Sequence, residues 1–316
     1  MIELLRYYYY IIIDRISYKN NNYYFKYQNN YFCFYKYKRN LDEINEIYNL
    51  NNYMLFNNIK INKIILNNKQ EILTFYKNNY YCLVLLNIFD NSIVDINKVL
   101  EFNRFKTNLN LLKRNNWYYL WSSKIDNIEY SINHLRIKYK LIYNSIYYYI
   151  GLAENAISYL KFVNLENDNL SICHRRVLYN TTLDSFYNPL NLIIDYRIRD
   201  LAEYIKSCFF KNRMDIIEII NYLKRIRLSS SDYIYFYIRM LFPSYYFDLY
   251  DDILSGKIKE ESILSITKMQ DDYEYLLYSI YLVIKEHINI IGIDWINKKF
   301  INWMKSILFD FCKGLW

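Results

Sequence analysis

The chain has 316 residues, enough to bury a sizeable core in one large domain or two lobes. Hydrophobic residues make up 53% of it, which excludes an intrinsically disordered protein. The formal charge of +8 comes from 40 Lys and Arg against 32 Asp and Glu, but the basic residues are scattered. Scattered charge favours a solvated surface over a phosphate-binding face, and an RNA-associated protein stays open as an alternative.

The N-terminal residues Met1–Ile13 are apolar but carry Glu3 and Arg6, and Asp14 follows them. This segment predicts a first strand rather than a signal peptide. No apolar run approaches the roughly 20 residues needed to cross a bilayer, so we expect a soluble, intracellular, cytoplasmic protein. The five cysteines are far apart without a CxxC motif, which favours reduced thiols, and three unpaired histidines argue against a zinc site.

Tyrosine and asparagine dominate the first 40 residues, where Tyr23–Tyr27 and Tyr31–Tyr37 predict strands. Asn20 to Asn22 and Asn29-Asn30 separate these strands, and asparagine tolerates the positive φ that turns require. Leu41–Phe56 changes to a helical period, with Asp42, Glu43 and Glu46 opposite its apolar stripe. Three further strands are predicted at Lys63–Leu66, Glu71–Tyr76 and Tyr80–Leu86.

After residue 88 the predicted elements are mainly helical. Helices are expected over Asp95–Phe105, Trp117–His134, Leu141–Leu160, Met214–Leu228, Ser262–His287 and Trp295–Phe311, with a strand at Leu190–Ile194. The organisation expected is therefore a small mixed strand and helix lobe over residues 1–88 and a large helical lobe over residues 89–316.

Three sequence signals predict helix ends in the helical part. Asp200 with Glu203 has the spacing of a capping box, and Ser229 begins Ser-Ser-Ser-Asp, which caps another helix. Pro243 is expected to end that second helix.

Residues 171–210 have the layout of a phosphotransferase active site: a loop led by His174, a buried strand ending in Asp195, and a helix after Asp200. Together with Trp117–Leu160 and Asn188–Lys206, this resembles the aminoglycoside phosphotransferase and choline kinase branch of the protein-kinase-like superfamily. Within that branch it is similar to the CotS/YutH-type spore coat proteins of spore-forming Firmicutes. The resemblance implies an α+β, two-lobed protein-kinase-like fold.

The same resemblance implies roles for the residues of the loop. In active members the loop reads His-Gly-Asp or His-Arg-Asp, and its Asp handles the proton of the substrate hydroxyl, while an Asn and a second Asp hold magnesium. Here His174, Arg175 and Arg176 put a guanidinium at the position of the loop Asp, and a guanidinium stays protonated. Asn180 and Asp195 are the candidates for metal ligands, although Asn180 is one residue short of the family spacing.

The small lobe departs further from active kinases, because no glycine precedes Gly151 to form a phosphate-covering loop. Lys36 and Lys38 are candidates for the strand lysine that contacts phosphates, and Glu43 or Glu46 for its partner on the helix.

Each of these residues also has a purely structural interpretation. His174 would be a hydrogen-bonded loop residue, Asp195 a carboxylate at the end of a strand, and the two arginines solvated charges. Asp184 is a possible substitute for the missing base.

We therefore expect a kinase-like pseudoenzyme that acts as a structural or interaction protein of the spore coat, with protein partners and no cofactor. The alternative is an ATP-dependent small-molecule phosphotransferase with rearranged catalytic residues, which needs ATP and magnesium.

Overall fold

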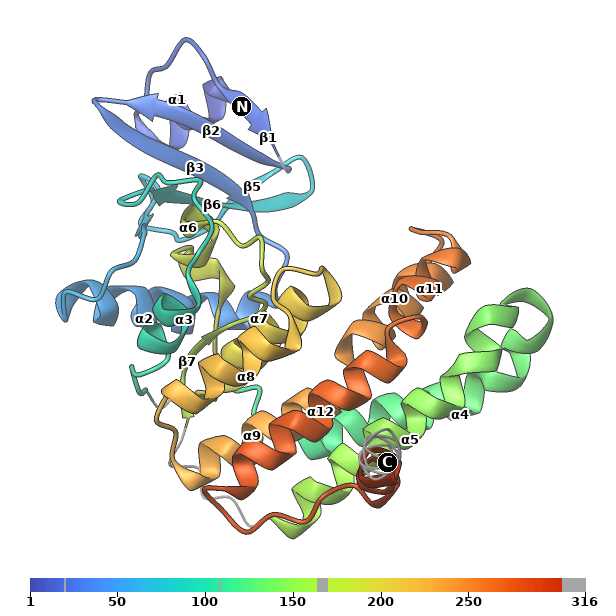
Figure 1. Ribbon diagram of the computed structural model, residues 1–316. Coiled ribbons are helices and arrows are strands. Elements are labelled where there is room, and N and C mark those ends of the chain that lie inside the picture. The colour runs from blue at the N-terminus through green and yellow to red at the C-terminus, as the bar shows by residue number, and fades with distance from the viewer. Residues whose placement is uncertain (20, 108, 164–169, 303–316) are drawn as a thin grey trace. The chain divides into compact units, whose positions relative to one another are not determined.

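The computed structural model describes residues 1–19, 21–107, 109–163 and 170–302 (Figure 1). The chain divides into two compact units. The first consists of Met1–Arg114 with Leu170–Asp195, and the second of Asn115–Asn169 with Tyr196–Trp316. The boundary between lobes expected near residue 88 stays a prediction.

The first unit is built on an antiparallel sheet in which β1, β2, β3, β6 and β4 are neighbours in that order, with β5 paired to β6. The strands are β1 (Ser17–Lys19), β2 (Asn22–Tyr27), β3 (Asn30–Lys36), β4 (Lys63–Ile65), β5 (Thr74–Tyr76) and β6 (Asn79–Leu85). The five strands predicted from aromatic and apolar runs are confirmed, with their ends shifted by up to three residues.

The hairpins of this sheet turn on residues with positive φ. Gln28 and Asn29, between β2 and β3, have φ of 47° and 65°, and Lys77 and Asn78, between β5 and β6, have φ of 44° and 59°. Positive φ at both central residues defines the type I′ turn that suits the twist of a hairpin. Asparagine thus does the work that glycine does in other chains, as the sequence predicts.

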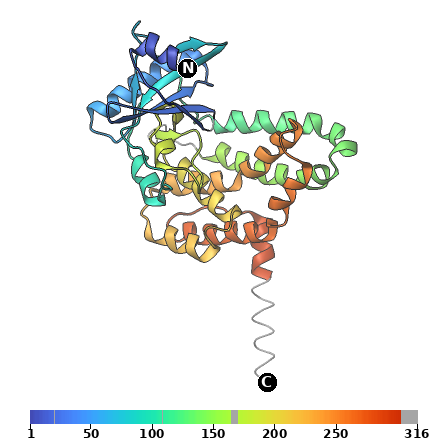
Figure 2. The same cartoon turned by 90° about the horizontal axis from the view of Figure 1, so that it is seen from above.

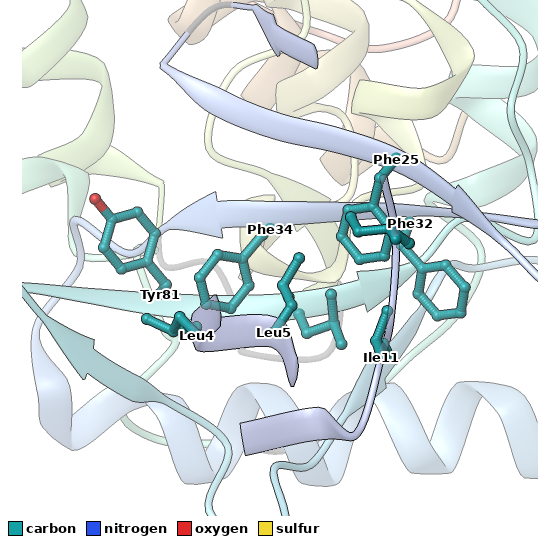
Figure 3. Packing of buried hydrophobic residues seen from close by; sticks show 9 residues of the cluster. Leu4, Leu5, Ile11, Phe25, Phe32, Phe34 and Tyr81 are labelled. Carbon is teal, nitrogen blue, oxygen red and sulfur yellow. The ribbon is translucent and has the colours of Figure 1, made fainter. Parts of the chain in front are cut away.

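A hydrophobic cluster covers one face of the sheet (Figure 3). Phe25, Phe32 and Phe34 alternate along β2 and β3 and meet Leu4 and Leu5 from the N-terminal segment. The strand predicted over Met1–Ile13 is wrong, because the structure has the helix α1 (Ile2–Tyr9) there. In a strand, Leu4 and Leu5 would point to opposite faces, whereas a helix turns both toward the sheet.

The remaining elements of the first unit are short, apart from one helix. They are η1 (Leu41–Glu43), α2 (Ile44–Phe56), α3 (Ile96–Phe102), β7 (Leu170–His174), α6 (Leu183–Phe186), η3 (Pro189–Asn191) and β8 (Leu192–Tyr196). The predicted helix at Leu41–Phe56 is confirmed as η1 followed by α2. β7 and β8 pair with each other in a small second sheet, and every residue of both strands is buried.

The second unit is helical. Its elements are α4 (Trp117–Lys138), α5 (Lys140–Phe162), α7 (Arg199–Phe210), α8 (Ile216–Arg225), α9 (Ser230–Leu241), α10 (Ser244–Leu254), η4 (Glu260–Ile263), α11 (Leu264–Thr267) and α12 (Gln270–Lys285). α5 packs against α4 and α9, and α12 packs against α8 and α9, as both views show (Figures 1 and 2). The predicted helix over Trp295–Phe311 lies outside the described residues from Trp303 onward.

One of the three predicted helix ends is corrected by the structure. Ser229 is the N-cap of α9 in a capping box with Asp232, and α9 ends before Pro243, both as predicted. Asp200 is not an N-cap, because α7 begins one residue earlier, at Arg199, and places Asp200 inside its first turn. At that position the carboxylate interacts favourably with the positive end of the helix dipole, but it does not cap the helix.

Candidate functional site

The loop led by His174 leaves the buried strand β7 in the first unit. His174 is itself buried, and its Nε2 lies 2.9 Å from the carbonyl oxygen of Phe186. Its ring stacks on the ring of Phe186 at a centroid distance of 4.2 Å and lies 4.7 Å from that of Phe102. These contacts favour the interpretation of His174 as a packing residue that supports the loop.

The two arginines after His174 are exposed and differ in their surroundings. The backbone N–H of Arg175 donates to the carbonyl of Asn191 at 2.7 Å, which ties the loop to η3 and β8. Arg175 also borders a cavity, whereas Arg176 is not among the described residues that line it.

This cavity, of about 340 Å³, lies within the first unit. It is bordered by the turn between β1 and β2, the end of β3, the residues after it, and the segment around α6. Four of its lining residues are cationic and one is acidic: Lys36, Lys38, Arg39, Arg175 and Asp184. The other lining side chains are asparagine, tyrosine, threonine, serine and a single leucine, so the cavity is polar and positively charged.

Lys36 and Lys38, the predicted phosphate lysines, both line this cavity. Their predicted partners on the helix are occupied elsewhere. The carboxylate of Glu46 accepts hydrogen bonds from the backbone N–H groups of Leu111 and Leu112, at 2.9 and 3.2 Å. Glu43 pairs with Arg39 and Arg114, and among the ion pairs of the described residues neither lysine joins either glutamate.

Arg39 is the lining residue that sequence reasoning missed. Its Nη2 lies 2.5 Å from Oε2 of Glu43, and its Nη1 donates to the carbonyls of Leu190 and Leu192 at 3.1 and 2.6 Å. Burial lowers the pKa of this guanidinium, the Glu43 carboxylate opposes that shift, and repulsion from Arg175 adds to it. The one signal in the sequence was the i, i+4 spacing of Arg39 and Glu43 at the start of a helix.

Three tyrosines also line the cavity. Burial is the main cause that raises the pKa of Tyr37 to about 12, and it raises the pKa values of Tyr24 and Tyr35 as well. Behind them, burial raises the pKa of the Cys33 thiol to about 12. All four groups therefore stay protonated near neutral pH, and the Tyr37 hydroxyl donates to the carbonyl of Asn40 at 2.8 Å.

Asp184, the predicted substitute base, is buried in the first turn of α6 and lines the cavity. Its Oδ1 accepts a short hydrogen bond from the hydroxyl of Thr182 and another from the backbone N–H of Ser185, at 2.8 Å. These are the contacts of a carboxylate that stabilises the start of a helix.

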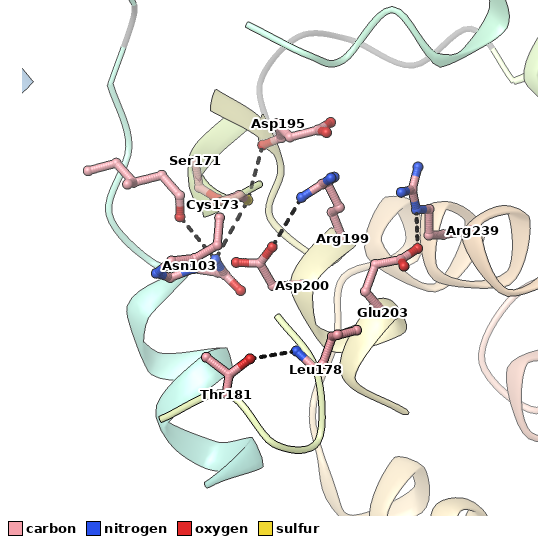
Figure 4. A network of polar contacts seen from close by, with 12 residues as sticks. Asn103, Ser171, Cys173, Leu178, Thr181, Asp195, Arg199, Asp200, Glu203 and Arg239 are labelled. Atoms are coloured by element: carbon pink, nitrogen blue, oxygen red, sulfur yellow. Dashed lines mark hydrogen bonds and ion pairs between the residues drawn. The ribbon is translucent and has the colours of Figure 1, made fainter. Parts of the chain in front are cut away.

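The two predicted metal ligands lie outside the cavity lining. Asp195 is buried in β8, where its backbone carbonyl accepts a contact of 3.7 Å from the thiol of Cys173 (Figure 4). Asn180 is exposed in the turn after the loop. Within the described residues no three His, Cys, Asp or Glu side chains gather in a metal-binding cluster.

Magnesium, which the phosphotransferase fold implies, does not fit this donor set. Mg²⁺ takes oxygen ligands, and its charge is offset by carboxylates or substrate phosphates. Asp184 supplies the one carboxylate among the described lining residues, and three nearby cationic side chains, Lys36, Lys38 and Arg175, would repel the ion.

The order of strands in the first unit, followed by a helical second unit, defines the kinase-like fold of the aminoglycoside phosphotransferases. An aminoglycoside phosphotransferase from Alicyclobacillus acidocaldarius superposes with a TM-score of 0.65 over 87% of this chain and 93% of that one, at 8% identity. A spectinomycin phosphotransferase in complex with ADP and spectinomycin gives 0.57 over 89% and 97%, at 11% identity. These likenesses show the fold.

The chain belongs to the family described as "Spore coat putative kinase YutH", whose model matches residues 2–280. It is 31% identical over 164 residues to the endospore coat-associated protein YutH of Bacillus subtilis (strain 168). That match covers 46% of this chain and 48% of the relative, so it spans about half the length of the curated protein. The expected family and fold are thus confirmed, and among the described helices none is long and apolar enough to cross a membrane.

Proposed function

We propose that this protein is a kinase-like pseudoenzyme that acts as an interaction protein of the spore coat. It is made in the cytoplasm and assembles with other coat proteins. The observation that carries the proposal is Arg176 at the position of the loop acid, next to Arg175, which lines a cavity with four cationic residues and one acidic residue in its described lining. Membership of the YutH family supports the link to the coat.

The chemistry of phosphoryl transfer is the reason for this choice. An attacking alcohol needs an acceptor for its proton, and the phosphates need a metal ion held by carboxylates. Arginine cannot accept a proton at any physiological pH. Loss of the base alone costs about 10²–10⁴-fold in rate. Among the described lining residues Asp184 is the one carboxylate, which does not make a set that could hold a metal.

A turnover assay tests this proposal. Purified protein, Arg176→Asp and Arg176→Ala are incubated with ATP, magnesium and a panel of alcohols and aminoglycosides, and phosphorylated products are detected by mass spectrometry. We expect none above the blank for all three proteins. The proposal is overturned if the wild type phosphorylates an acceptor, and turnover retained by Arg176→Ala would show that the reaction does not depend on this residue.

The alternative, an ATP-dependent small-molecule phosphotransferase, has one observation in its favour. Asp184, the substitute base, does line the cavity. If it accepts the substrate proton, Asp184→Asn abolishes turnover while leaving the fold intact, because the amide oxygen still accepts from Ser185.

The cellular half of the proposal has its own test. A fluorescent fusion expressed during sporulation in a spore-forming host should form a shell at the spore surface. Uniform fluorescence in the mother cell throughout coat assembly contradicts a coat role, whatever the turnover assay gives.

A further inference from the structure

We infer that the cavity of the first unit binds a small phosphate-bearing molecule as a free anion, without a divalent cation. Lys36, Lys38 and Arg175 supply the positive charge that magnesium supplies in a phosphotransferase. The inference rests on the proposed function, because an active phosphotransferase would need its phosphates on the metal.

The cationic groups approach the cavity from two parts of the unit. Lys36 ends β3 and is half-buried, Lys38 follows it two residues later, and Arg175 comes from the loop after β7. Arg175 and Arg39 lie close enough for their charges to repel, which contributes to the lowered pKa of Arg39. Like charges gathered around one cavity are relieved by a bound anion.

The neutral lining suits an oxyanion as well. Tyr24, Tyr35 and Asn22 line the cavity with phenol and amide groups, whereas the hydroxyls of Tyr37 and Thr182 already donate to the carbonyl of Asn40 and to Asp184. Oxyanions accept hydrogen bonds from such donors, and those bonds are stronger than bonds between neutral groups.

The size of the cavity selects a small ligand. Its volume of about 340 Å³ lies at the lower end of the range for ligand pockets, which is about 300–1,000 Å³. A phosphate ester or pyrophosphate fits that space, whereas a segment of folded partner protein does not.

Asp184 sets the expected response to magnesium. It is the one acidic group among the described lining residues, and its Oδ1 is already bonded to Thr182 and Ser185. A magnesium ion bound to the phosphates neutralises their negative charge, so the lysines and Arg175 attract the ligand less strongly. Asp184 offers the ion little attraction to offset this loss, because its Oδ1 is already hydrogen-bonded. Magnesium should therefore weaken binding, the reverse of its effect in a phosphotransferase.

Isothermal titration calorimetry with pyrophosphate and with ATP, each in EDTA and in excess magnesium, tests the inference. We expect saturable 1:1 binding in EDTA and about fivefold or more weaker binding in magnesium. Lys36→Gln and Arg175→Gln should each weaken binding in EDTA by about fivefold, since one attractive charge is lost. Lys63→Gln, at an exposed position of β4 outside the cavity, is the matched control and should bind as the wild type does.

Asp184→Asn supplies a prediction of the opposite sign. Removing the repulsive carboxylate should tighten binding by about twofold or more in EDTA. Thermal unfolding of each variant identifies any that is misfolded, and Asp184→Asn remains informative even if the cationic variants are unstable.

No binding of either probe in EDTA, or binding that appears only with magnesium, overturns the inference. Either result without turnover leaves the pseudoenzyme proposal in place. Turnover in the product assay overturns the pseudoenzyme proposal, and the calorimetry in EDTA still decides whether the anion binds without metal.

Discussion

Arg39 and Glu43 form an ion pair at 2.5 Å in which the side chains are only 4% and 12% exposed. The pair joins the residues after β3 to the start of α2, and Arg39 also reaches two carbonyls beside β8. One guanidinium thereby connects the segment from the end of β3 to the start of α2 with two carbonyls that lie 151 and 153 residues later in the sequence. Its charge is neutralised within the structure, so its contribution is to hold one wall of the cavity in place.

Glu43→Gln should lower the free energy of unfolding by about 3 kcal/mol, because it leaves the buried guanidinium of Arg39 without its counter-charge. Urea unfolding followed by far-ultraviolet circular dichroism measures the change. Asp252→Asn is the control, since it breaks the ion pair between Lys257 and Asp252, whose side chains are 67% and 42% exposed, and the loss of an exposed pair should hardly change the stability. Equal losses in the two variants would contradict the structural role of Arg39.

Lys206, in the second unit, gives a prediction for the pH dependence of stability. Its buried ammonium donates to the carbonyls of Arg239 and Phe242 and to the hydroxyl of Ser244, at 2.8, 3.1 and 2.8 Å. Glu203 lies 3.2 Å away and also pairs with Arg239 (Figure 4). Burial lowers the pKa of Lys206 to about 8 from its ordinary 10.5, although Glu203 opposes the shift.

Between about pH 8 and 10.5 the unfolded chain therefore holds a proton at Lys206 that the folded chain has lost, so stability from this group rises with pH. The difference in unfolding free energy between the wild type and Lys206→Met should move in favour of the wild type across this window. Urea titrations at pH 7, 8, 9 and 10 measure it. A difference that stays flat would show that Lys206 remains protonated in the fold.

The buried tyrosines predict a loss of stability at high pH. Burial raises the pKa values of Tyr35, Tyr237 and Tyr273 well above the ordinary 10.0. Their contribution is complete below pH 10 and is lost as the pH rises above that value, because the unfolded phenols ionise first. Phenolate absorbance and circular dichroism should change together above pH 10, and Tyr273→Phe should reduce the slope. Ionisation of the buried phenols with the secondary structure intact would contradict this account.

Glycine should have opposite effects at two asparagines, Asn78 in the turn between β5 and β6 and Asn52 in the helix α2. Asn78 has φ of 59° in the turn, so Asn78→Gly should be neutral or stabilising, while Asn78→Val should cost about 1–2 kcal/mol. In the helix α2, exposed Asn52 has no such need, and Asn52→Gly should cost about 0.3 kcal/mol. Thermal melts of the three variants measure these differences. Destabilisation by Asn78→Gly would contradict the type I′ turn.

Much of the fold was predictable because periodicity decides it. Leu41–Phe56 and the strands flanking it carry their apolar residues at the spacing of the elements they form. The N-terminal helix was not predictable in this way, because Tyr and Ile favour strands and the sheet face that receives Leu4 and Leu5 is assembled from later residues. Asp200 was misassigned because a cap is defined by the residue at which the helix begins, and α7 begins one residue before Asp200.

The candidate site was predicted residue by residue but not as a set. Lys36, Lys38, Arg175 and Asp184 each stood out in the sequence, and the structure brings these four to one cavity. Arg39 was missed because a basic residue in a run of basic residues is usually exposed to solvent. The neighbouring residues in the sequence do not indicate that its side chain is buried. The contacts of Glu43 with Arg114 and of Glu46 with Leu111 join residues that are 71 and 65 positions apart.

No tryptophan occurs among residues 1–114 and 170–195, which form the first unit, and in the second unit Trp117 and Trp121 stack at a centroid distance of 5.1 Å. Arg239 lies over both rings, at 4.9 and 5.5 Å. Fluorescence excited at the red edge of the indole absorption band therefore reports on the helical unit alone. The first unit, with its sheet and cavity, does not contribute to that signal. If the melting curves from fluorescence and from circular dichroism have different midpoints, the two units unfold one after the other. The native tryptophans thus label one unit without any engineered probe.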